Sequence, residues 1–152
     1  MEVQSDYKEG YDFSKVKTFA VIHKPKEGEN SLSVDRIIAA IAHTLQAKGL
    51  KQTKPTQADL LFLFHLNVTN KTDIYTDYQV VGFGRRSTVI ATPRSYNYDE
   101  GRLIIDAVDR KLKKTVYRVE IKDELKAKKT PKAREAYIQK AIQKALQSFP
   151  PS

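Results

Sequence analysis

Apolar and polar residues alternate most regularly between Leu103 and Ile121, on either side of a short basic segment. If Asp109 pairs with Thr115, residues 110–114 become the loop of a β-hairpin. Strand side chains alternate between the two faces, so this register gathers six apolar side chains on one face. They are Leu103, Ile105, Ala107, Tyr117, Val119 and Ile121. A shift of one residue would mix the two faces, so the pattern predicts this register.

On the opposite face, the same register places Asp106 directly across from Arg118. The other pairs expected there are Ile104 with Glu120 and Val108 with Val116. Opposite charges across a ladder stabilise it by a few tenths to about 1 kcal/mol. An aspartate in an apolar strand could instead be a general base with a raised pKa. No nucleophile, histidine or second carboxylate stands at a diagnostic spacing from it, so we interpret Asp106 and Arg118 as a structural ion pair.

Two amphipathic stripes predict helices, because their apolar residues recur every three or four positions. The first stripe consists of Val34, Ile37, Ile38, Ile41 and Leu45, and the second of Ile138, Ala141, Ile142, Ala145 and Leu146. We expect Ser31 or Ser33 to cap the first helix and Gly49 to end it. Thr130 is the expected cap of the second helix, with Pro131 at its first position.

The remaining elements are predicted to be strands. Lys17–Ile22 is rich in β-branched and aromatic residues, and Asp59–Val68 places five apolar residues on one face. Residues 75–91 suggest two short strands around Gly82–Arg86, which we interpret as a second hairpin with a mobile tip. The element order β-α-β-ββ-ββ-α predicts an α+β fold. We expect a two-layer sandwich, with a mostly antiparallel sheet and two helices on one face.

Length and composition indicate one domain. A chain of 152 residues can bury a core without staples, and we expect a single domain over residues 11–151 after a flexible leader or membrane tether, Met1–Gly10. The longest apolar run, Leu60–Leu66, is far shorter than the roughly 20 residues of a membrane helix. The opening Met1–Asp6 is polar and unlike an export signal, so we expect either a cytoplasmic protein or a mature segment with an added methionine. The absence of cysteine excludes disulfides, thiolate metal sites and cysteine nucleophiles.

The formal net charge of +9 allows three interpretations. A basic surface favours nucleic acid, an anionic partner in the cell envelope such as lipid or lipopolysaccharide, or solubility alone. The basic residues are spread along the chain and form no single stripe interleaved with aromatic residues. Nucleic acid is therefore the least favoured of the three.

The candidate chemistry is sparse. His43 should be solvated, because it lies nearly opposite the apolar stripe of its helix. His23 and His65 could approach each other on neighbouring strands, but a metal site would need a carboxylate as well. No HxH or HExxH spacing is present. We therefore predict no catalytic residue, no metal ligand and no cofactor.

One segment is a candidate binding surface. Its residues are Gly82, Phe83, Gly84, Arg85 and Arg86, with Tyr78, Tyr96 and Tyr98 beside them. Glycines and arginines together can form a backbone nest for an anion, although the segment lacks the strand–glycine–helix context of a nucleotide site. Tyrosines are frequent at interfaces, but a hairpin tip and a half-buried strand would show the same pattern.

Four markers in order carry a family resemblance. They are Tyr11–Lys15 ahead of Lys17–Ala20, Ala58–Leu61, Glu100–Asp106 with Lys113–Arg118, and Phe149–Pro151. Together they resemble a bacterial envelope lipoprotein family known as domain of unknown function 4136. The chain departs from that family's pattern at Tyr117, where relatives often have tryptophan, and at Gly82–Arg86, which is more polar than the glycine- and tyrosine-rich segment of relatives.

The resemblance implies a location more than a reaction. Members are typically exported and lipidated on a cysteine just before the mature domain, and the family is not known to be enzymatic. We therefore expect a non-enzymatic, periplasm-facing lipoprotein module at the outer membrane that binds a partner protein or anionic lipid. The anchor is inferred, because that cysteine is not in this sequence.

Two alternatives stay open. The first is a cytoplasmic, basic nucleic-acid-binding domain. The second is a hydrolase that uses Asp106 and a histidine. The sequence leaves the oligomeric state undetermined.

Overall fold

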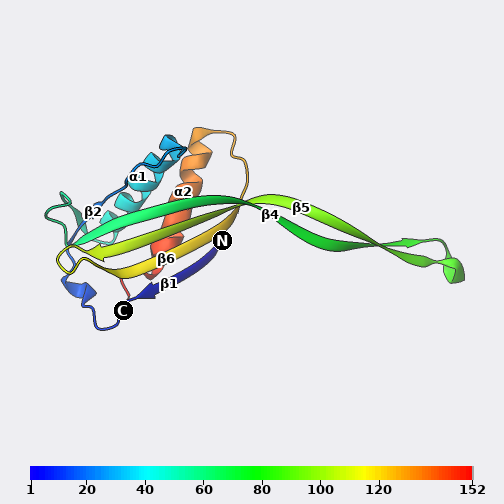
Figure 1. The fold of residues 1–152 in the computed structure, drawn as a ribbon, viewed down its shortest axis with the longest axis horizontal. Helices are drawn as coiled ribbons and strands as arrows, with labels where there is room; N and C mark the ends of the chain where they lie inside the picture. The colour runs from blue at the N-terminus through cyan, green and yellow to red at the C-terminus, as the bar shows by residue number, and fades with distance from the viewer. Residues whose placement is uncertain (152) are drawn as a thin grey trace.

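A computed structural model describes residues 1–151 and shows one six-stranded sheet with two helices over one of its faces (Figure 1). The strands are β1 (Glu2–Tyr7), β2 (Thr18–Val21), β3 (Lys51–Gln52), β4 (Leu60–Val81), β5 (Thr88–Asp109) and β6 (Lys114–Leu125). The helices are α1 (Ser31–Ala47) and α2 (Pro131–Ala145), and the single-turn 3₁₀ helices are η1 (Phe13–Lys15), η2 (Gly84–Arg86) and η3 (Leu146–Ser148). The structure is therefore an α+β sandwich of two layers.

The sheet is mixed, with the order β1-β6-β5-β4-β2-β3. The pairs β1–β6, β6–β5 and β5–β4 are antiparallel, whereas β2 pairs in parallel with both β4 and β3. Helix α1 connects β2 to β3 and β4, and such a crossover is what parallel neighbours require. The expected element order also lacked β1 and β3, so the mostly antiparallel sheet predicted from the sequence describes one part of the observed sheet.

Strand β1 lies within the segment expected to be a leader. It pairs with β6 from Glu2 opposite Lys122 to Tyr7 opposite Tyr117. Five of its six residues are exposed, and only Val3 packs against the core. An edge strand with so little buried surface carries no clear hydrophobic alternation, and β1 could therefore not be predicted from the sequence.

The register predicted for the β5–β6 hairpin is confirmed on its apolar face and for the pair Asp106–Arg118. It is wrong near the loop, where Val108 faces Thr115 and Asp109 faces Lys114. A β-bulge after Ala107 causes the shift. The bulge allows Val116 and Tyr117 to be buried in succession, each with 1% exposure.

The predicted ion pair is present on the face of the sheet opposite the helices. The Arg118 Nε donates to Asp106 Oδ1 at 2.5 Å and its Nη2 donates to Oδ2 at 3.1 Å. Both carboxylate oxygens of Asp106, a residue that is only 9% exposed, are thereby occupied. This bidentate geometry holds β5 and β6 in register.

The helix ends follow capping rules, with one correction. Asn30, rather than Ser31 or Ser33, caps α1, because its side-chain oxygen accepts from the backbone N–H groups of Leu32 and Ser33. Gly49 follows the helix with a φ of +93°, as predicted. The predicted cap of α2 is also confirmed, since Thr130 Oγ1 accepts from the N–H of Ala133 at 3.1 Å.

The core lies between the helices and the sheet and has an aromatic centre. Phe149, just beyond η3, makes edge-to-face contacts with Phe13, Phe62 and Tyr117, with ring centroids 5.1–5.9 Å apart. Such pairs add about 0.5–1.5 kcal/mol each beyond burial. The hydroxyl of Tyr117 meets Ser148 Oγ at 2.7 Å, which ties β6 to the end of the chain.

Asp59 fixes the start of the parallel pair β2–β4. Its Oδ2 accepts from the backbone N–H groups of Lys17 at 2.8 Å and Thr18 at 3.1 Å. Thr18 Oγ1 accepts in return from the N–H of Asp59 at 2.9 Å. The hydrogen bond from Lys17, followed by those from Thr18, lowers the pKa of Asp59 despite its partial burial.

We predict that Asp106 and Arg118 couple energetically across the sheet. In urea unfolding, Asp106→Asn and Arg118→Gln should each destabilise the protein. Their double mutant should show a coupling of about 0.5–1 kcal/mol. Pairing Asp106→Asn with Arg94→Gln, a distant substitution, is the control and should be additive. Additive losses for the cross-strand pair itself would contradict the structural role of Asp106.

We also predict that Asp59 makes part of the stability depend on pH. Its pKa is lower in the folded than in the unfolded state, so its contribution is complete above the unfolded pKa of about 3.9 and is lost as the pH falls through the folded value. Asp59→Asn should cost about 1 kcal/mol near pH 7, and the difference from the native chain should shrink below pH 4. Urea unfolding at pH 7 and pH 3 measures this, and an equal difference at both values would refute it.

Candidate functional site

Beyond the sandwich, β4 and β5 continue as a two-stranded ribbon that projects from the body (Figure 1). We call residues 70–99 the arm. Strand β5 pairs with β6 only as far as Asp99 opposite Leu125, and β4 pairs with β2 only as far as Phe62 opposite Val21. The β4–β5 pairing itself runs unbroken to Val81 opposite Thr88. In the arm, therefore, each strand has one partner and one open edge.

A separate short hairpin was predicted over residues 75–91. That prediction is wrong, because the hairpin is not separate from the strands of the body. Its strands are the far ends of β4 and β5. The joining residues 69–73 are polar, so no hydrophobic alternation in the sequence connects residues 75–91 to the body. Pairs of polar side chains hold this stretch instead, such as Thr72 with Asn97 at 2.7 Å and Asn70 with Asp99 at 3.1 Å.

One face of the arm is apolar towards its far end. By alternation, this face continues the core-facing side of β4 and β5. We call it the apolar stripe, and its residues are Ile74, Tyr78, Val80, Val89, Ala91 and Pro93. Ile74, Tyr78, Val80 and Val89 are 61–79% exposed. The opposite face carries tyrosines and most of the arm's charged residues, which are Lys71, Asp73, Asp77 and Arg94.

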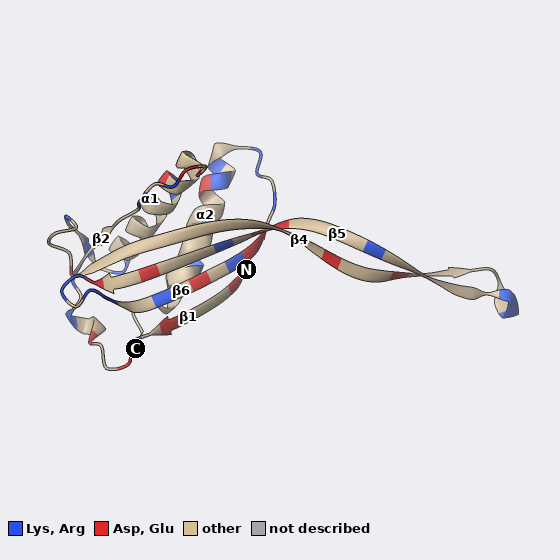
Figure 2. Cartoon of the chain, in the orientation of Figure 1, with Lys and Arg blue, Asp and Glu red and all other residues tan. Residues whose placement is uncertain are grey.

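The tip of the arm combines an exposed aromatic ring with two cations. Phe83 is 94% exposed, and η2 places Arg85 and Arg86 beside it at the far end of the ribbon (Figure 2). Gly82 has a φ of +100°, and a Cβ built on it would lie 2.5 Å from the carbonyl oxygen of Arg86. The tight turn therefore requires glycine at this position.

The structure divides the predicted binding surface into two parts. Gly82–Arg86 and Tyr78 lie at the far end of the arm. Tyr96 and Tyr98 alternate onto the other face and lie closer to the body, where their rings stack with centroids 5.7 Å apart. The hydroxyl of Tyr96 also donates to Glu124 of β6, and this hydrogen bond raises the pKa of Tyr96.

The histidines do not converge. His43 is exposed, as predicted. The ring of His23 stacks on Phe64 at 4.3 Å and pairs with Glu29 at 2.9 Å, a contact that lowers the pKa of Glu29. His65 follows Phe64 in β4 and alternates to the other face. Among residues 1–151, no three histidine, aspartate or glutamate side chains form a group that could hold a metal ion.

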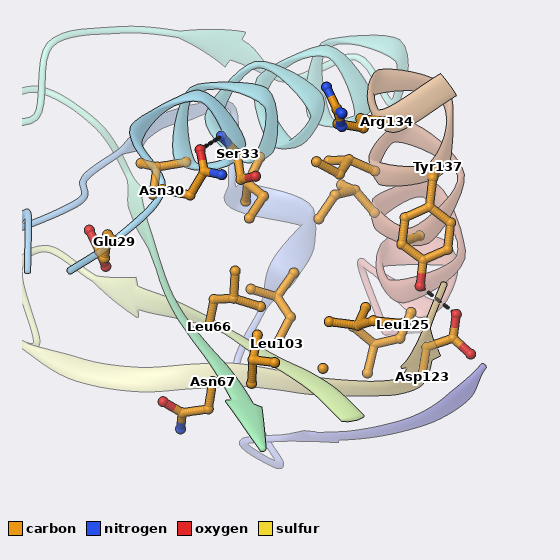
Figure 3. A pocket seen from close by; sticks show the side chains of 18 of the residues that line it. Glu29, Asn30, Ser33, Leu66, Asn67, Leu103, Asp123, Leu125, Arg134 and Tyr137 are labelled. Atoms are coloured by element: carbon orange, nitrogen blue, oxygen red, sulfur yellow. Dashed lines mark hydrogen bonds between the residues drawn. The ribbon is translucent and has the colours of Figure 1, made fainter. Parts of the chain in front are cut away.

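A cavity of about 720 Å³ opens at the root of the arm, between the sheet and the N-terminal halves of both helices (Figure 3). Leu66, Leu103 and Leu125 point from the sheet towards the helices, whereas Asn67 points away. The other apolar wall residues are Met1, Val34, Ile37, Val68, Ile121, Ile138, Ala141 and Ile142.

The mouth of the cavity carries polar groups. Tyr137 of α2 donates its hydroxyl to Asp123 of β6 (Figure 3). Burial, followed by this hydrogen bond, raises the pKa of Tyr137. The ammonium of Lys128 lies 4.9 Å from the centre of the Tyr137 ring. Lys126 and Arg134 also line the opening.

This cavity was not predicted from the sequence, although the length of the apolar face of β4 is one signal of it. The apolar face of β4 runs from Leu60 to Val68, but its residues are buried only as far as Phe64. Leu66 is 38% exposed and Val68 is 56% exposed. The apolar face of β4 is thus longer than the part that the helices bury. The residue at which this burial ends depends on the positions of the helices, which the sequence does not show.

Neither helix in the described part of the chain combines the length and apolar character that crossing a bilayer requires.

Known structures share the fold. A PDZ domain protein from Parabacteroides distasonis is 15% identical with a TM-score of 0.59, and the match covers 99% of this chain and 35% of that chain. The chain thus spans about a third of that protein's length. The PelC dodecamer from Paraburkholderia phytofirmans is 11% identical with a TM-score of 0.56, and the match covers 95% of this chain and 93% of that chain.

At this level of identity, these likenesses establish the fold alone. No curated protein matches the sequence. A family model does match, and it extends over residues 3–151. Because this match includes the sandwich, the arm and the cavity, the chain belongs to the family described as "Domain of unknown function (DUF4136)".

Proposed function

We propose that this chain is a non-enzymatic domain of the cell envelope that binds a partner protein through its arm. The proposal includes a position facing the periplasm and a lipid anchor in the native precursor, as the family resemblance implies. A structural role for Asp106, whose two oxygens are held by Arg118, supports a non-enzymatic domain.

The exposed apolar stripe is the observation that carries this proposal. Soluble domains rarely leave a continuous apolar patch in water, and such patches mark interaction sites. Here the stripe ends at Phe83, with two arginines beside it. Tyrosine and arginine are among the residues that contribute most to protein interfaces.

The open edges of the arm favour a protein over a lipid bilayer. Both strands present backbone N–H and C=O groups without a second strand to pair with. Such groups are expensive to bury in hydrocarbon, where open sheet edges do not occur. A protein partner can instead satisfy them by adding a strand.

The charges of the arm define the kind of partner. Residues 70–99 contain four basic and three acidic residues, and two of the four basic residues, Arg85 and Arg86, are at the tip. We therefore expect an apolar groove bordered by carboxylates to receive the tip. Lysines and arginines elsewhere lie on separate parts of the body (Figure 2), so the net charge of +9 forms no continuous track for nucleic acid.

A shortened arm should leave the fold intact. Replacing residues 74–95 by Asn-Gly would close the ribbon between Asp73 and Tyr96, which face each other in the ladder. The removed side chains are almost all exposed, so we expect a change in unfolding free energy within about 0.5 kcal/mol. Urea unfolding measures it, and a loss of several kcal/mol would show that the arm supports the fold rather than a partner.

Site-specific photo-crosslinking tests the partner. With a benzophenone amino acid at Phe83, irradiation of bacteria that produce the full-length precursor should give one discrete protein adduct. Adding Ile74→Ser, Tyr78→Ser and Val80→Ser on the apolar stripe should reduce the adduct at least tenfold. Adding Tyr75→Ser and Ile90→Ser on the other face is the matched control and should leave it unchanged.

The adduct must also be reproduced with purified protein. The partner identified by mass spectrometry should bind the native chain directly, and the stripe variant should bind at least tenfold more weakly. The proposal fails if the probe at Phe83 labels only lipid or nucleic acid. It also fails if the control variant loses as much adduct as the stripe variant.

A further inference from the structure

We propose that the cavity at the root of the arm binds a single acyl chain that carries an anionic head group, such as a long-chain fatty acid. The site is separate from the apolar stripe and the tip. The proposal therefore does not depend on the partner proposed for the arm.

The walls of the cavity require an apolar ligand. Leucine, isoleucine, valine and alanine side chains from β4, β5, β6, α1 and α2 form its interior. Its volume of about 720 Å³ lies within the range of known small-molecule sites. Ordered water needs two to four polar partners, which the aliphatic side chains of this interior do not offer.

The geometry of the floor fits an acyl chain. Leu66 of β4 lies directly across the ladder from Leu103 of β5, which in turn lies across from Ile121 of β6. Beside this row, Gly101 adds no side chain. The three strands thus provide a continuous apolar surface, which the half-buried Ile138 and Ala141 of α2 face from the opposite wall.

Charge at the mouth selects an anionic head group. Residues 126–134, which lead from β6 into α2, contain five basic residues and no acidic one. Three of these, Lys126, Lys128 and Arg134, line the cavity. Within residues 1–151, none of the three forms an ion pair with a carboxylate.

The acidic residues around the opening are mostly engaged. They are Glu27, Glu29 and Asp123, and the remaining cations are Lys26 and the N-terminal ammonium of Met1, which lies 3.5 Å from Asp123. Glu29 accepts from His23 and from the backbone N–H of Lys26 at 3.0 Å, and Asp123 accepts from Tyr137. The cations therefore outnumber the three carboxylates around the opening, and Lys126, Lys128 and Arg134 are left to meet a carboxylate or phosphate head group.

Fluorescence of cis-parinaric acid provides a direct test, because the chain contains no tryptophan that would interfere. The probe should bind the native protein below its aggregation concentration, and palmitate should displace it. Two-dimensional NMR should show palmitate shifting the methyl signals of Leu66, Leu103 and Leu125. Dodecyltrimethylammonium, which has the opposite charge, should bind at least tenfold more weakly than dodecanoate.

Substitutions separate the cavity from non-specific binding. Ala141→Phe fills the cavity and should weaken palmitate binding at least tenfold, whereas Ala136→Phe places the same ring on the exposed face of α2 and should have no effect. If Ala141→Phe does not fold, Val68→Trp fills the cavity from the more exposed end of its floor. Combining Lys128→Gln with Arg134→Gln should weaken palmitate binding about fivefold and leave hexadecanol binding unchanged.

The shortened-arm variant makes the two proposals distinguishable, since it should lose the partner and still bind palmitate. The acyl site is refuted if the native protein binds neither probe, or if Ala136→Phe weakens binding as much as Ala141→Phe. Equal affinity for dodecanoate and dodecyltrimethylammonium would refute the selection of an anion.

Discussion

The antiparallel ladder between β4 and β5 is the interaction on which the rest of the molecule depends. It runs without a break from Leu60 opposite Asp109 to Val81 opposite Thr88. Its first ten residue pairs, as far as Thr69 opposite Glu100, form the centre of the sheet, with β6 and β1 on one side and β2 and β3 on the other. Its last twelve residue pairs, from Asn70 opposite Asp99 onward, leave the body as the arm. One uninterrupted alternation therefore determines both which side chains form the core and which side chains the arm exposes.

The cavity follows from a difference in length between the two layers. Each strand of the ladder has 22 residues, whereas α1 has 17 and α2 has 15. A helix rises about 1.5 Å per residue and a strand about 3.3 Å, so the helices cover only part of the strands. Phe62 and Phe64 are covered completely, and each such burial is worth about 1.5–3 kcal/mol. Leu66 and Val68 lie beyond this closely packed part, and the space between them and the N-terminal halves of the helices is the cavity.

Elements could be predicted from the sequence where the two faces of a strand carry clearly different residue types. The β5–β6 register could be read because apolar residues define one face and Asp106 with Arg118 defines the other. The bulge at Val116 could not be predicted, because it depends on how much space the core offers to two consecutive side chains, Val116 and Tyr117. Strand β1 and the middle of the arm were missed for the opposite reason: their side chains face water on both sides, so no hydrophobic period marks them.

The candidate site was only partly visible for a related reason. Tip residues such as Gly82 and Phe83 could be located from the sequence, because a glycine-rich segment between two apolar runs marks a turn between strands. The tyrosines seemed to belong with them, but Tyr96 and Tyr78 alternate to different faces, and only the register of a long ladder separates them. The cavity combines residues from five elements, and no local pattern predicts which ends of two helices stand away from a sheet.

The positions of the basic residues say more about a ligand than the net charge of the chain does. The total of +9 suggests a general affinity for anions, yet the arm is nearly neutral and its most exposed surface is apolar. Five cations are concentrated instead in residues 126–134, and three of them, Lys126, Lys128 and Arg134, line the cavity. Long-range attraction between exposed charges is screened beyond about 8 Å at physiological ionic strength. A local group of cations beside an apolar space therefore selects an anionic amphiphile more effectively than the net charge of the whole chain could.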